Sequence, residues 1–462
     1  MAASLFFGFG FQKAPRMDAF RIVGGRPLKG TVRINSAKNA ALPLMAATLM
    51  APDSKLLGVP DLSDTRSMIK LMASLGVAAE ITPSAVKGAP GMDLACKVTS
   101  TEQSQASYDI MKTMRAGICV LGPMVGARGE ARVSMPGGCA IGDRPIDLHL
   151  RGLKALGAKI ELDGGYIVVR APGKDGRLIG ARVFLGGPNG STVTGTANVL
   201  SAAVLAKGTT VIECAACEPE VVDLANFLTK MGAQISGAGT PRMIIHGVDS
   251  LKPATHQVMA DRIEAGTYVC AAAMTGGDVV LENFPTDTLA AAIDRWNEMG
   301  VTLEPVNLKR GQTFEPGLSD SVRVVCERVI RATEIVTQPH PGFPTDLQAQ
   351  FMALMTLAEG NSIVTEKIYP DRFMHAPELQ RMGAKIIRIN NVAVVSGARG
   401  LTGAPVMASD LRASASLVIA GLAARGETTI NRVYHLDRGY QQMEVTLRAL
   451  GADIERINVK EG

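Results

Sequence analysis

A sixfold repeat constrains what this chain can fold into more than any other feature of its sequence. Leu-Gly or Met-Gly, followed by Ala or Val, recurs at the end of six amphipathic helical patterns. The glycines are Gly76, Gly157, Gly232, Gly300, Gly383 and Gly451, and successive ones lie 68 to 83 residues apart. Because glycine readily takes the left-handed conformation that ends a helix, each one predicts a helix C-terminus just before a strand. The sequence therefore predicts six similar units.

A second type of helix accompanies the first. Five alanine-rich segments are apolar nearly all round, and they cover residues 40–50, 196–206, 265–274, 347–358 and 413–424. Helices with this pattern must be buried on every side. Their alternation with short strands predicts an α/β (α+β) architecture in which sheets enclose helices, and a plain solenoid is the alternative.

Length and composition narrow the possible classes of protein. A chain of 462 residues exceeds one ordinary core, and it contains no Gly/Pro/Ser-rich linker, so we expect two domains joined by short crossings. Aromatic residues make up only 4%, which argues against a base-stacking nucleic-acid surface. The net charge of +5 is small, so any anion site must come from local clusters of Arg and Lys. No apolar run is long enough to span a membrane.

The cysteines and the N-terminal segment carry less information. There are seven cysteines without a disulfide-framework spacing, which fits a reducing compartment. Cys214 and Cys217 have the spacing of half a zinc site, but no second pair accompanies them, so a metal site is disfavoured. Residues 1–16 lack a basic region ahead of their apolar run, and we expect a disordered extension or an upstream start before a strand that opens at Met17.

One glycine-rich loop contains a thiol followed by a cation. Cys139 lies within residues 136–142, which include three glycines, and Arg144 follows. Glycines let a backbone approach a ligand closely, and a nearby arginine favours a thiolate or holds an anion. A tight surface turn with an incidental cysteine is the equally weighted alternative.

Charged residues interrupt the apolar helices at their starts. Lys38 follows Asn35 and Ser36, either of which is a plausible N-cap, and a lysine at the positive end of a helix suits a phosphate. Residues 109–116 begin another buried helix and include Arg115. The alternative for Lys38 is an ordinary solvated lysine.

Three arginines share a further pattern. Arg372, Arg412 and Arg438 each adjoin or closely follow an aspartate, namely Asp371, Asp410 and Asp437. We expect these carboxylates to hold the guanidinium groups in place, although a single such pair is usually a surface salt bridge. Together with Lys38, Arg115 and Arg144, the arginines predict a substrate that carries both phosphate and carboxylate.

Asp346 follows two prolines at the start of a buried helix. Taken alone it reads as a helix cap. Beside several arginines and a cysteine loop, it becomes a candidate general base.

Seven motifs together resemble the enolpyruvyl transferases, from Met17 to the C-terminus. They are AKNAALP (37–43), KTMRA (112–116), PGGCAIG (136–142), FPTD (343–346), DRFMH (371–375), DLRASA (410–415) and DRGY (437–440). The resemblance implies a two-domain inside-out α/β barrel, each domain holding three βαβαββ repeats around buried parallel helices. It places residues 17–37 and 260–462 in one discontinuous domain and residues 38–259 in the other, with the active cleft between them and the Cys139 loop as its lid.

The resemblance also implies substrates and residue roles. Phosphoenolpyruvate would be bound by Lys38, Asn39, Arg144, Arg372, Arg412 and Arg438. UDP-N-acetylglucosamine would be bound by Arg115, Arg144, Pro145, Ile146, Asp147, Leu148, Asp346 and Ile368. Asp346 would take the proton of the sugar 3-hydroxyl as general base, and Cys139 would protonate the methylene carbon of phosphoenolpyruvate and be the target of fosfomycin.

The implied reaction is addition followed by elimination of phosphate, the first committed step of peptidoglycan synthesis, with no cofactor and no metal. A cytoplasmic monomer or weak homo-oligomer is expected, without nucleic-acid or membrane partners. An enolpyruvylshikimate-phosphate synthase and a non-catalytic nucleotide-sugar-binding paralogue are the alternatives. Two stretches depart from the family pattern: nucleotide contacts in residues 191–194 are uncertain, and residues 307–334 look expanded, as surface loops.

Overall fold

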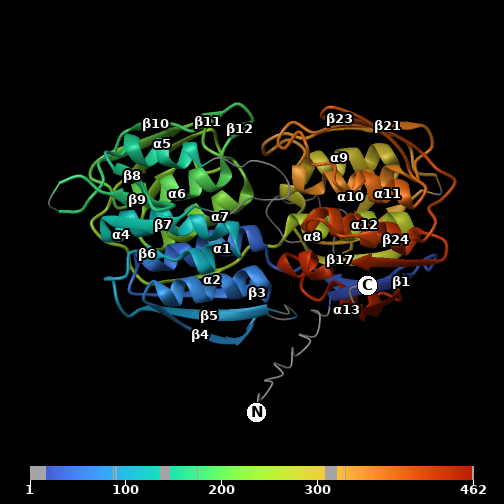
Figure 1. Ribbon diagram of the computed structural model, residues 1–462, viewed down its shortest axis with the longest axis horizontal. Coiled ribbons are helices and arrows are strands. Elements are labelled where there is room, and N and C mark those ends of the chain that lie inside the picture. The colour runs from blue at the N-terminus through green and yellow to red at the C-terminus, as the bar shows by residue number, and fades with distance from the viewer. Residues whose placement is uncertain are drawn as a thin grey trace, which may run out of the picture.

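The computed structural model describes residues 17–459, except residues 87, 89, 90, 136–145, 174, 307–319 and 328. The described chain forms two lobes that lie side by side (Figure 1). Each lobe contains three four-stranded sheets. We name them the N-lobe, which contains the sheets of β3, β7 and β13, and the C-lobe, which contains the sheets of β17, β21 and β25.

The N-lobe sheets have the orders β16-β3-β5-β4, β6-β7-β9-β8 and β10-β13-β15-β14, and a short hairpin β11-β12 accompanies them. The strands are β3 (Asp53–Pro60), β4 (Val77–Pro83), β5 (Gly91–Val98), β6 (Gln105–Ala106), β7 (Glu130–Ser134), β8 (Lys159–Asp163), β9 (Tyr166–Arg170), β10 (Arg182–Phe184), β11 (Gly186–Gly187), β12 (Gly190–Ser191), β13 (Thr209–Glu213), β14 (Gln234–Ser236), β15 (Arg242–His246) and β16 (Ala254–Gln257). The helices are α1 (Lys38–Ala47), η1 (Thr48–Met50), α2 (Ser63–Ser74), α3 (Tyr108–Met111), η2 (Arg115–Val120), α4 (Leu121–Arg128), α5 (Asp147–Ala155), α6 (Val193–Ala203) and α7 (Pro219–Lys230), where η marks a 3₁₀-helix.

The C-lobe sheets have the orders β18-β19-β17-β2, β20-β21-β23-β22 and β24-β25-β1-β26. The strands are β1 (Met17–Val23), β2 (Lys29–Arg33), β17 (Asp278–Phe284), β18 (Val301–Pro305), β19 (Asp320–Cys326), β20 (Glu334–Val336), β21 (Asn361–Thr365), β22 (Lys385–Ile389), β23 (Val392–Ser396), β24 (Pro405–Met407), β25 (Glu427–Asn431) and β26 (Asp453–Val459). The helices are α8 (Arg262–Thr275), η3 (Thr286–Thr288), α9 (Ala290–Met299), η4 (Thr345–Leu347), α10 (Gln348–Met355), α11 (Ala376–Arg381), α12 (Leu411–Ala423), η5 (Val433–Arg438) and α13 (Met443–Ala449).

All of these four-stranded sheets share one pairing pattern. One edge strand pairs in parallel with its neighbour, as β10 does with β13, and the other two pairings are antiparallel. In four of the sheets the parallel partner is reached through a buried helix, because a parallel pair needs a crossover connection. In the sheets of β3 and β17 the parallel partner, β16 or β2, lies more than 190 residues away in sequence. The βαβαββ unit implied by the resemblance is therefore present in both lobes.

The C-lobe is built from two separate parts of the chain, which lie before and after the N-lobe in sequence. β2 comes before the N-lobe in sequence but pairs with β17 of the C-lobe, and β16 pairs with β3 of the N-lobe before the chain continues into α8. The two crossings touch at a bridge between Ser36 and Ala260. The N-terminal strand β1 lies between β25 and β26, near the end of the chain. Two short crossings, rather than a linker, thus join the lobes.

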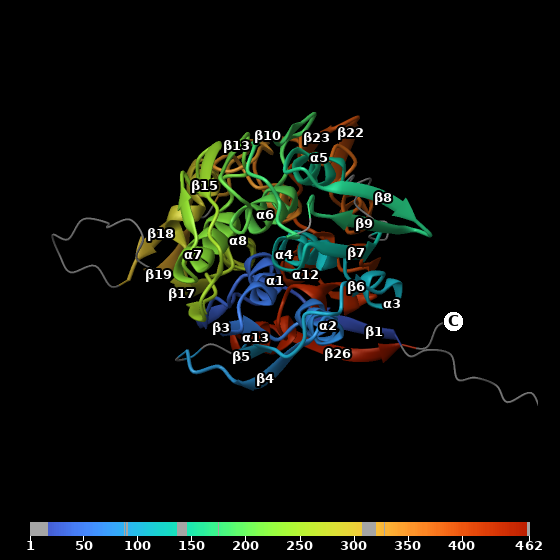
Figure 2. The same cartoon turned by 90° about the vertical axis from the view of Figure 1, so that its left-hand side faces the viewer.

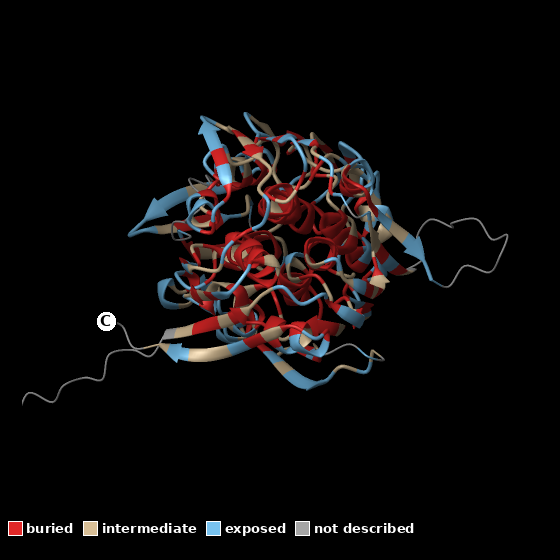
Figure 3. Ribbon diagram, turned by 90° about the vertical axis from the view of Figure 1, so that its right-hand side faces the viewer, coloured by how far each residue is buried: buried red, intermediate tan, exposed pale blue. Residues whose placement is uncertain are grey.

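The core of each lobe is a set of buried helices. In the N-lobe α4 packs against α6, and in the C-lobe α8, α10 and α12 pack on one another. Residues 195–203 of α6 and 412–422 of α12 are all buried, as their apolar sequences predict. Figure 2 shows the N-lobe sheets around these helices, and Figure 3 shows buried residues gathered in the central helices of the C-lobe. Each lobe has its own apolar cluster.

The structure confirms the α/β class and the helix ends. All six repeat glycines have positive φ, from 78° at Gly76 to 102° at Gly232. The sheets enclose the helices but remain separate, so in the described chain they do not close into a barrel. Among the described residues, no helix combines the length and apolarity that crossing a membrane requires.

Two local expectations are wrong. Part of the stretch expected as surface loops is a regular strand, β19, which pairs with both β17 and β18 because its alternating valines face the core. The helix expected over residues 109–116 is interrupted between α3 and η2. There Lys112 lies on the surface, paired with Asp109 rather than facing a site.

Candidate active site

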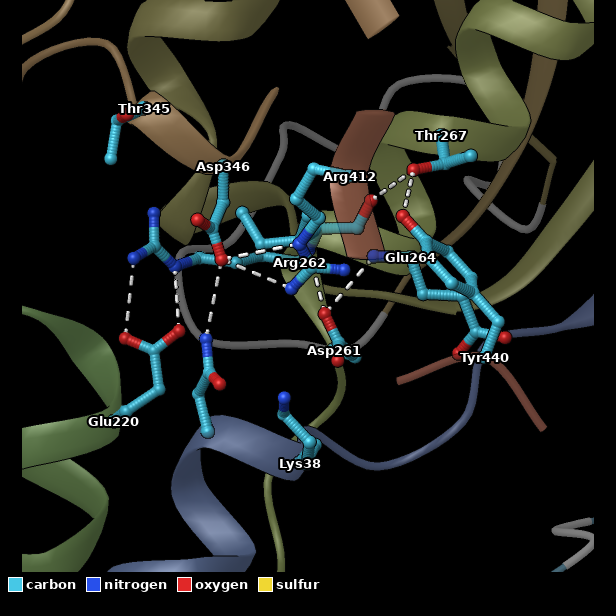
Figure 4. Close-up of polar contacts among 12 residues, drawn as sticks. Lys38, Glu220, Asp261, Arg262, Glu264, Thr267, Thr345, Asp346, Arg412 and Tyr440 are labelled. Atoms are coloured by element: carbon cyan, nitrogen blue, oxygen red, sulfur yellow. Dashed lines mark hydrogen bonds and ion pairs between the residues drawn. The ribbon is translucent and has the colours of Figure 1, made fainter. Parts of the chain in front are cut away.

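The starts of buried helices from both lobes meet at the boundary between them. Lys38 is the first residue of α1, Arg262 is the first of α8, and Arg412 is the second of α12. Figure 4 shows Lys38, Arg262, Asp346 and Arg412 gathered in one place. Exposed amides at a helix start favour negative charge, so this arrangement suits an anionic ligand.

Asp346 is the centre of the polar contacts. Its Oδ1 accepts a hydrogen bond of 2.7 Å from Nη1 of Arg372, and its Oδ2 accepts from Nε and Nη2 of Arg412 at 3.2 and 3.1 Å. Nδ2 of Asn39, from the N-lobe, lies 3.5 Å from the same Oδ2. The side chain of Asp346 keeps 26% exposure. The carboxylate is thus held by both lobes and remains accessible to a ligand.

The two arginines are buried and stay charged. Burial alone lowers the pKa of Arg372, but Asp346 and Asp410 raise it, and the net pKa lies above the ordinary value. Burial likewise lowers the pKa of Arg412, and Tyr440, Asp346 and Asp261 together raise it above the ordinary value. Nη1 of Arg412 is buried and has no hydrogen-bond partner. This guanidinium group therefore keeps one buried N–H that Asp346 does not satisfy.

Lys38 and Arg438, which were also predicted to bind the phosphate, both contact one carboxylate. The buried carboxylate of Asp64, on α2, lies 3.3 Å from Nζ of Lys38 and 3.0 Å from Nε of Arg438, which comes from η5 of the C-lobe. Burial lowers the pKa of Lys38, Asp64 opposes that shift, and Arg412 and Arg438 add to it. Asp64 therefore neutralises two cations that come from different lobes.

A buried ion pair also crosses the boundary. Arg262 donates from Nε and Nη2 to the two oxygens of Glu220 on α7, at 2.9 and 3.2 Å, and both residues are buried. Nearby, the His340 amide donates to Glu218, and burial raises the pKa of that carboxyl group. Figure 4 shows Glu220 reaching from α7 toward Arg262. These contacts fix the position of the lobes beside the site.

The predicted N-cap of α1 is wrong. The cap residue is Ala37, which makes no side-chain hydrogen bond, and Asn35 instead donates its amide to the buried Glu264 at 2.9 Å. The backbone leaves one lobe at this point, so the Asn35 side chain faces α8 rather than α1. Burial, followed by repulsion from Asp261, raises the pKa of Glu264 to about 8.

The aspartates predicted to hold the neighbouring arginines do not do so. Asp371 pairs with Arg388, and Asp437 pairs with Arg456. Asp410 caps α12 by accepting the amides of Arg412 and Ala413. Adjacent residues point in different directions, so the partners come from elsewhere: Asp346 for Arg372 and Arg412, and Asp64 for Arg438.

The segment predicted to bind the nucleotide is anchored by a buried histidine. Ile146 precedes α5, Asp147 is exposed, and Leu148 packs beside Gly187 of the hairpin β11-β12. His149 bonds through Nε2 to Thr194 at 3.1 Å and through Nδ1 to Asn198 at 2.9 Å. Burial, with a further contribution from Arg115, lowers the pKa of His149 to about 4. The imidazole is therefore neutral and links α5 to the start of α6.

The segment that departs from the family pattern forms this helix start. Thr192 is the N-cap of α6 and accepts the amide of Gly195. Gly190 has φ of 97°, and a Cβ there would lie 2.8 Å from Pro339 of the C-lobe, so the hairpin reaches the other lobe. A polar helix start consequently faces the boundary even without the usual family residues.

Ile368 lies just beyond β21, and its amide donates to the buried Glu366 at 2.8 Å. Cys139, Arg144 and Pro145 lie outside the described residues. In the described part of the chain, no group of three or more His, Cys, Asp or Glu side chains has the arrangement of a metal site, and the six cysteines there are free thiols.

Sequence reasoning did not identify several residues that hold the site together. Asp64, Glu220, Arg262 and Glu366 all lie in or next to helices and strands where a charged residue reads as a solvated position. The glutamates and Asp64 are nevertheless buried. The available signal was weak: each interrupts an otherwise apolar pattern, and only the packing shows which partner neutralises it.

Comparisons with known proteins identify relatives of this chain. The profile of the family described as EPSP synthase (3-phosphoshikimate 1-carboxyvinyltransferase) matches residues 22–447. The UDP-N-acetylglucosamine 1-carboxyvinyltransferase of Zymomonas mobilis is 50% identical over 443 residues, which are 96% of this chain and 100% of that protein.

Solved structures show the same fold. The enolpyruvyl transferase NikO from Streptomyces tendae superposes with a TM-score of 0.83 at 24% identity, covering 96% of this chain and 100% of that one. An EPSP synthase from Acinetobacter baumannii gives a TM-score of 0.69 at 18% identity, covering 95% of this chain and 100% of that one. At these identities the likeness extends to the fold alone.

Proposed function

The chain belongs to the EPSP synthase family of carboxyvinyl (enolpyruvyl) transferases, and we propose that it transfers the enolpyruvyl group of phosphoenolpyruvate to the 3-hydroxyl group of UDP-N-acetylglucosamine. The observation that carries the reaction class is the meeting of Asn39, Arg372 and Arg412 at Asp346. The choice of acceptor rests on the 50% identity to the Zymomonas mobilis protein. Shikimate 3-phosphate is the alternative acceptor.

The geometry suggests how the residues divide the work. Arg372 and Arg412, which both pair with Asp346, bind the carboxylate of phosphoenolpyruvate. Lys38 and Arg438, with Arg144, bind the phosphate. Asp346 is the general base for the sugar hydroxyl, because its carboxylate is both oriented by the arginines and partly exposed.

The addition step needs a proton on the methylene carbon, which we assign to Cys139. The activated hydroxyl then attacks the resulting cationic carbon to give a tetrahedral ketal. In the elimination, the bond to phosphate breaks while the new methyl group loses a proton, and the double bond forms again. The cations stabilise negative charge as it moves onto the leaving phosphate. Arg115, Pro145, Ile146, Asp147, Leu148 and Ile368 complete the nucleotide-sugar site.

The remaining expectations belong to the same proposal. We infer that the N-lobe, residues 38–259, and the C-lobe, residues 17–37 and 260–462, are two domains that close on the substrates, with the Cys139 loop as lid. The enzyme would act in the cytoplasm as a monomer or weak homo-oligomer, at the first committed step of peptidoglycan synthesis, and fosfomycin would alkylate Cys139.

Phosphate release tests the proposal directly. Purified protein is mixed with phosphoenolpyruvate and either UDP-N-acetylglucosamine or shikimate 3-phosphate, and inorganic phosphate is followed with time. We expect release with the nucleotide sugar only. Release with shikimate 3-phosphate alone would select the alternative enzyme, and release with neither would favour a non-catalytic nucleotide-sugar-binding protein.

A variant tests the role of the thiol. Cys139→Asp keeps a proton donor but removes the sulfur, so we expect it to remain active and to resist fosfomycin. The residual rate after incubation with the drug measures this, with wild-type protein as the control. Inhibition equal to that of the wild type would show that fosfomycin acts elsewhere.

A further inference from the structure

A buried carboxylate lies behind the arginine and the aspartate of the site. Glu366 has no exposed surface, and none of the described Lys or Arg side chains forms an ion pair with it. Its Oε1 accepts from the Thr337 hydroxyl at 2.7 Å and from the amides of Ile368 and Tyr369 at 2.8 and 2.9 Å. Its Oε2 accepts from the Thr345 hydroxyl at 2.9 Å. Four neutral donors thus satisfy the buried carboxylate. An uncharged residue at this position would not need these four hydrogen bonds.

The Thr345 hydroxyl has a defined direction. A hydroxyl group has one proton to donate, and here that proton goes to Glu366. The oxygen is therefore free to accept from Nη1 of Arg372, which lies 3.0 Å away. The same Nη1 donates to Oδ1 of Asp346 at 2.7 Å. The hydrogen bonds run in one order, from Arg372 to Thr345 to Glu366, and they begin at the group that contacts Asp346.

We propose that Glu366 is a positioning residue for the transfer reaction: by fixing the direction of the Thr345 hydroxyl, it holds the Arg372 guanidinium group against Asp346. The same carboxylate holds the amides of Ile368 and Tyr369, so it ties the sugar-facing segment to the general base. This inference rests on the proposed function. It assigns a role to Thr345 and to Glu366, of which Glu366 is fully buried.

The substitution Glu366→Gln separates this role from simple packing. A glutamine has nearly the same shape, and its carbonyl oxygen can remain at Oε1, where three donors meet. Its amide group then faces Thr345 and donates to that hydroxyl. The hydroxyl proton then loses its acceptor on Oε2, and the hydroxyl oxygen must accept from two donors at once. The hydrogen bond from Arg372 therefore weakens, and Arg372 moves away from Asp346.

The test is a double-mutant cycle on turnover. Glu366→Gln, Thr345→Val and the double variant are compared with the wild type for kcat and for KM of both substrates. We expect Glu366→Gln to lower kcat by about tenfold to a hundredfold, since a small misplacement of a catalytic group costs that much. In the Thr345→Val background the same substitution should change kcat by less than about twofold, because the relay is already broken.

Two further variants control for folding and for shape. Thr345→Ser retains the hydroxyl group and should recover most of the kcat lost in Thr345→Val. Glu444→Gln alters another largely buried glutamate, which accepts from Arg456 away from Asp346, and it should leave kcat within about twofold. Thermal melting of every variant shows whether the loss of kcat follows a loss of stability.

The outcomes separate this inference from the proposed function. Independent, multiplying effects of the two substitutions on kcat would overturn the relay, as would an unchanged kcat in Glu366→Gln. A crystal structure of that variant gives a readout without turnover: the distance from Arg372 Nη1 to Asp346 Oδ1 should lengthen from 2.7 Å. An unchanged distance refutes the relay, whereas a wild-type protein that transfers no enolpyruvyl group refutes only the proposed function.

Discussion

The two lobes repeat one architecture but begin their buried helices differently. In the C-lobe, Asp261 and Asp410 each accept two backbone amides at the starts of α8 and α12, and Asp346 lies just before α10. In the N-lobe, α1 has no side-chain cap and α6 is capped by the neutral Thr192. Carboxylates therefore compensate the positive helix ends in one lobe, and in the other those ends stay available to an anion.

This difference suggests how one repeat acquired two roles. The C-lobe carboxylates attract arginines, and the result is a rigid base held by Arg372 and Arg412. The N-lobe supplies Lys38 at an uncapped helix start, with Asp64 as its only ion-pair partner in the described chain. A duplicated architecture thus provides the base and the anion site from opposite sides of one boundary.

The largest expected effect comes from removing the C-lobe carboxylate. Asp346→Asn should lower kcat by about 10³-fold, within the range for loss of a general base. The amide also leaves Arg372 and Arg412 without their counterion. Steady-state phosphate release measures the change, and thermal melting serves as the folding control. A loss of less than about tenfold would show that another group takes the proton.

The next largest effect concerns the contact between the lobes. Glu220→Gln should lower the free energy of unfolding by about 3 kcal/mol, because it leaves Arg262 charged and buried without its partner. Urea unfolding followed by circular dichroism measures this. Glu161→Gln, which breaks an exposed pair with Arg170, should cost less than about 1 kcal/mol. Equal costs would mean that the boundary pair adds nothing beyond a surface contact.

One buried histidine in each lobe should make the stability of the protein depend on pH. Burial lowers the pKa of His149 and of His375 from 6.5 to about 4, so the folded protein binds fewer protons than the unfolded chain between those values. Stability is therefore present above pH 6.5 and falls as the pH drops toward about 4. His149→Gln should reduce that slope by up to about 1.4 kcal/mol per pH unit.

Unfolding midpoints measured from pH 7 to pH 4.5 provide the check for His149. His375→Gln is the matched variant in the C-lobe, where Nε2 of the histidine has no hydrogen-bond partner. An unchanged slope in both variants would place the acid sensitivity elsewhere, for instance at paired carboxylates.

The smallest expected effect comes from removing a helix cap, and one cap from each lobe is compared. Asp410→Ala removes a charged cap from α12, and Thr192→Ala removes a neutral cap from α6. Each should cost about 1 kcal/mol of stability, and the aspartate should cost more because its charge also interacts with the helix dipole. Urea midpoints of the two variants decide the order. A larger cost for Thr192→Ala would contradict the contrast between the lobes.

The repeat allowed much of the fold to be predicted from the sequence. Glycines at helix ends and apolar helices identified the units, because backbone conformation and burial leave local patterns. The predicted helix starts were late, however: α6 begins at Val193 rather than at residue 196, and α8 begins at Arg262 rather than at residue 265. The apolar pattern marks only the turns that consist of apolar residues. The first turn of each of these helices contains polar residues, which the pattern leaves out.

The residues of the site could be predicted from the sequence, but their ion-pair partners could not. Asn39, Arg372 and Arg412 meet at Asp346, and Lys38 and Arg438 meet at Asp64. The aspartates beside the three arginines nevertheless bind elsewhere. Ion pairs between residues distant in sequence depend on how the lobes pack. Neighbouring positions in the chain carry no record of that packing, so Asp64 and Glu366 left no interpretable local signal.

The pairing of strands that lie far apart in sequence has a consequence for the time course of synthesis. As the chain leaves the ribosome, β2 waits for β17, which follows some 250 residues later, and β1 waits for β25 and β26 at the far end of the chain. In the N-lobe, the sheet of β3 lacks its fourth strand until β16 has emerged. The N-lobe can therefore mature during translation, whereas the C-lobe completes its sheets only after nearly the whole chain is made. Until then, the first strands have unpaired edges, and strands of other proteins can pair with them.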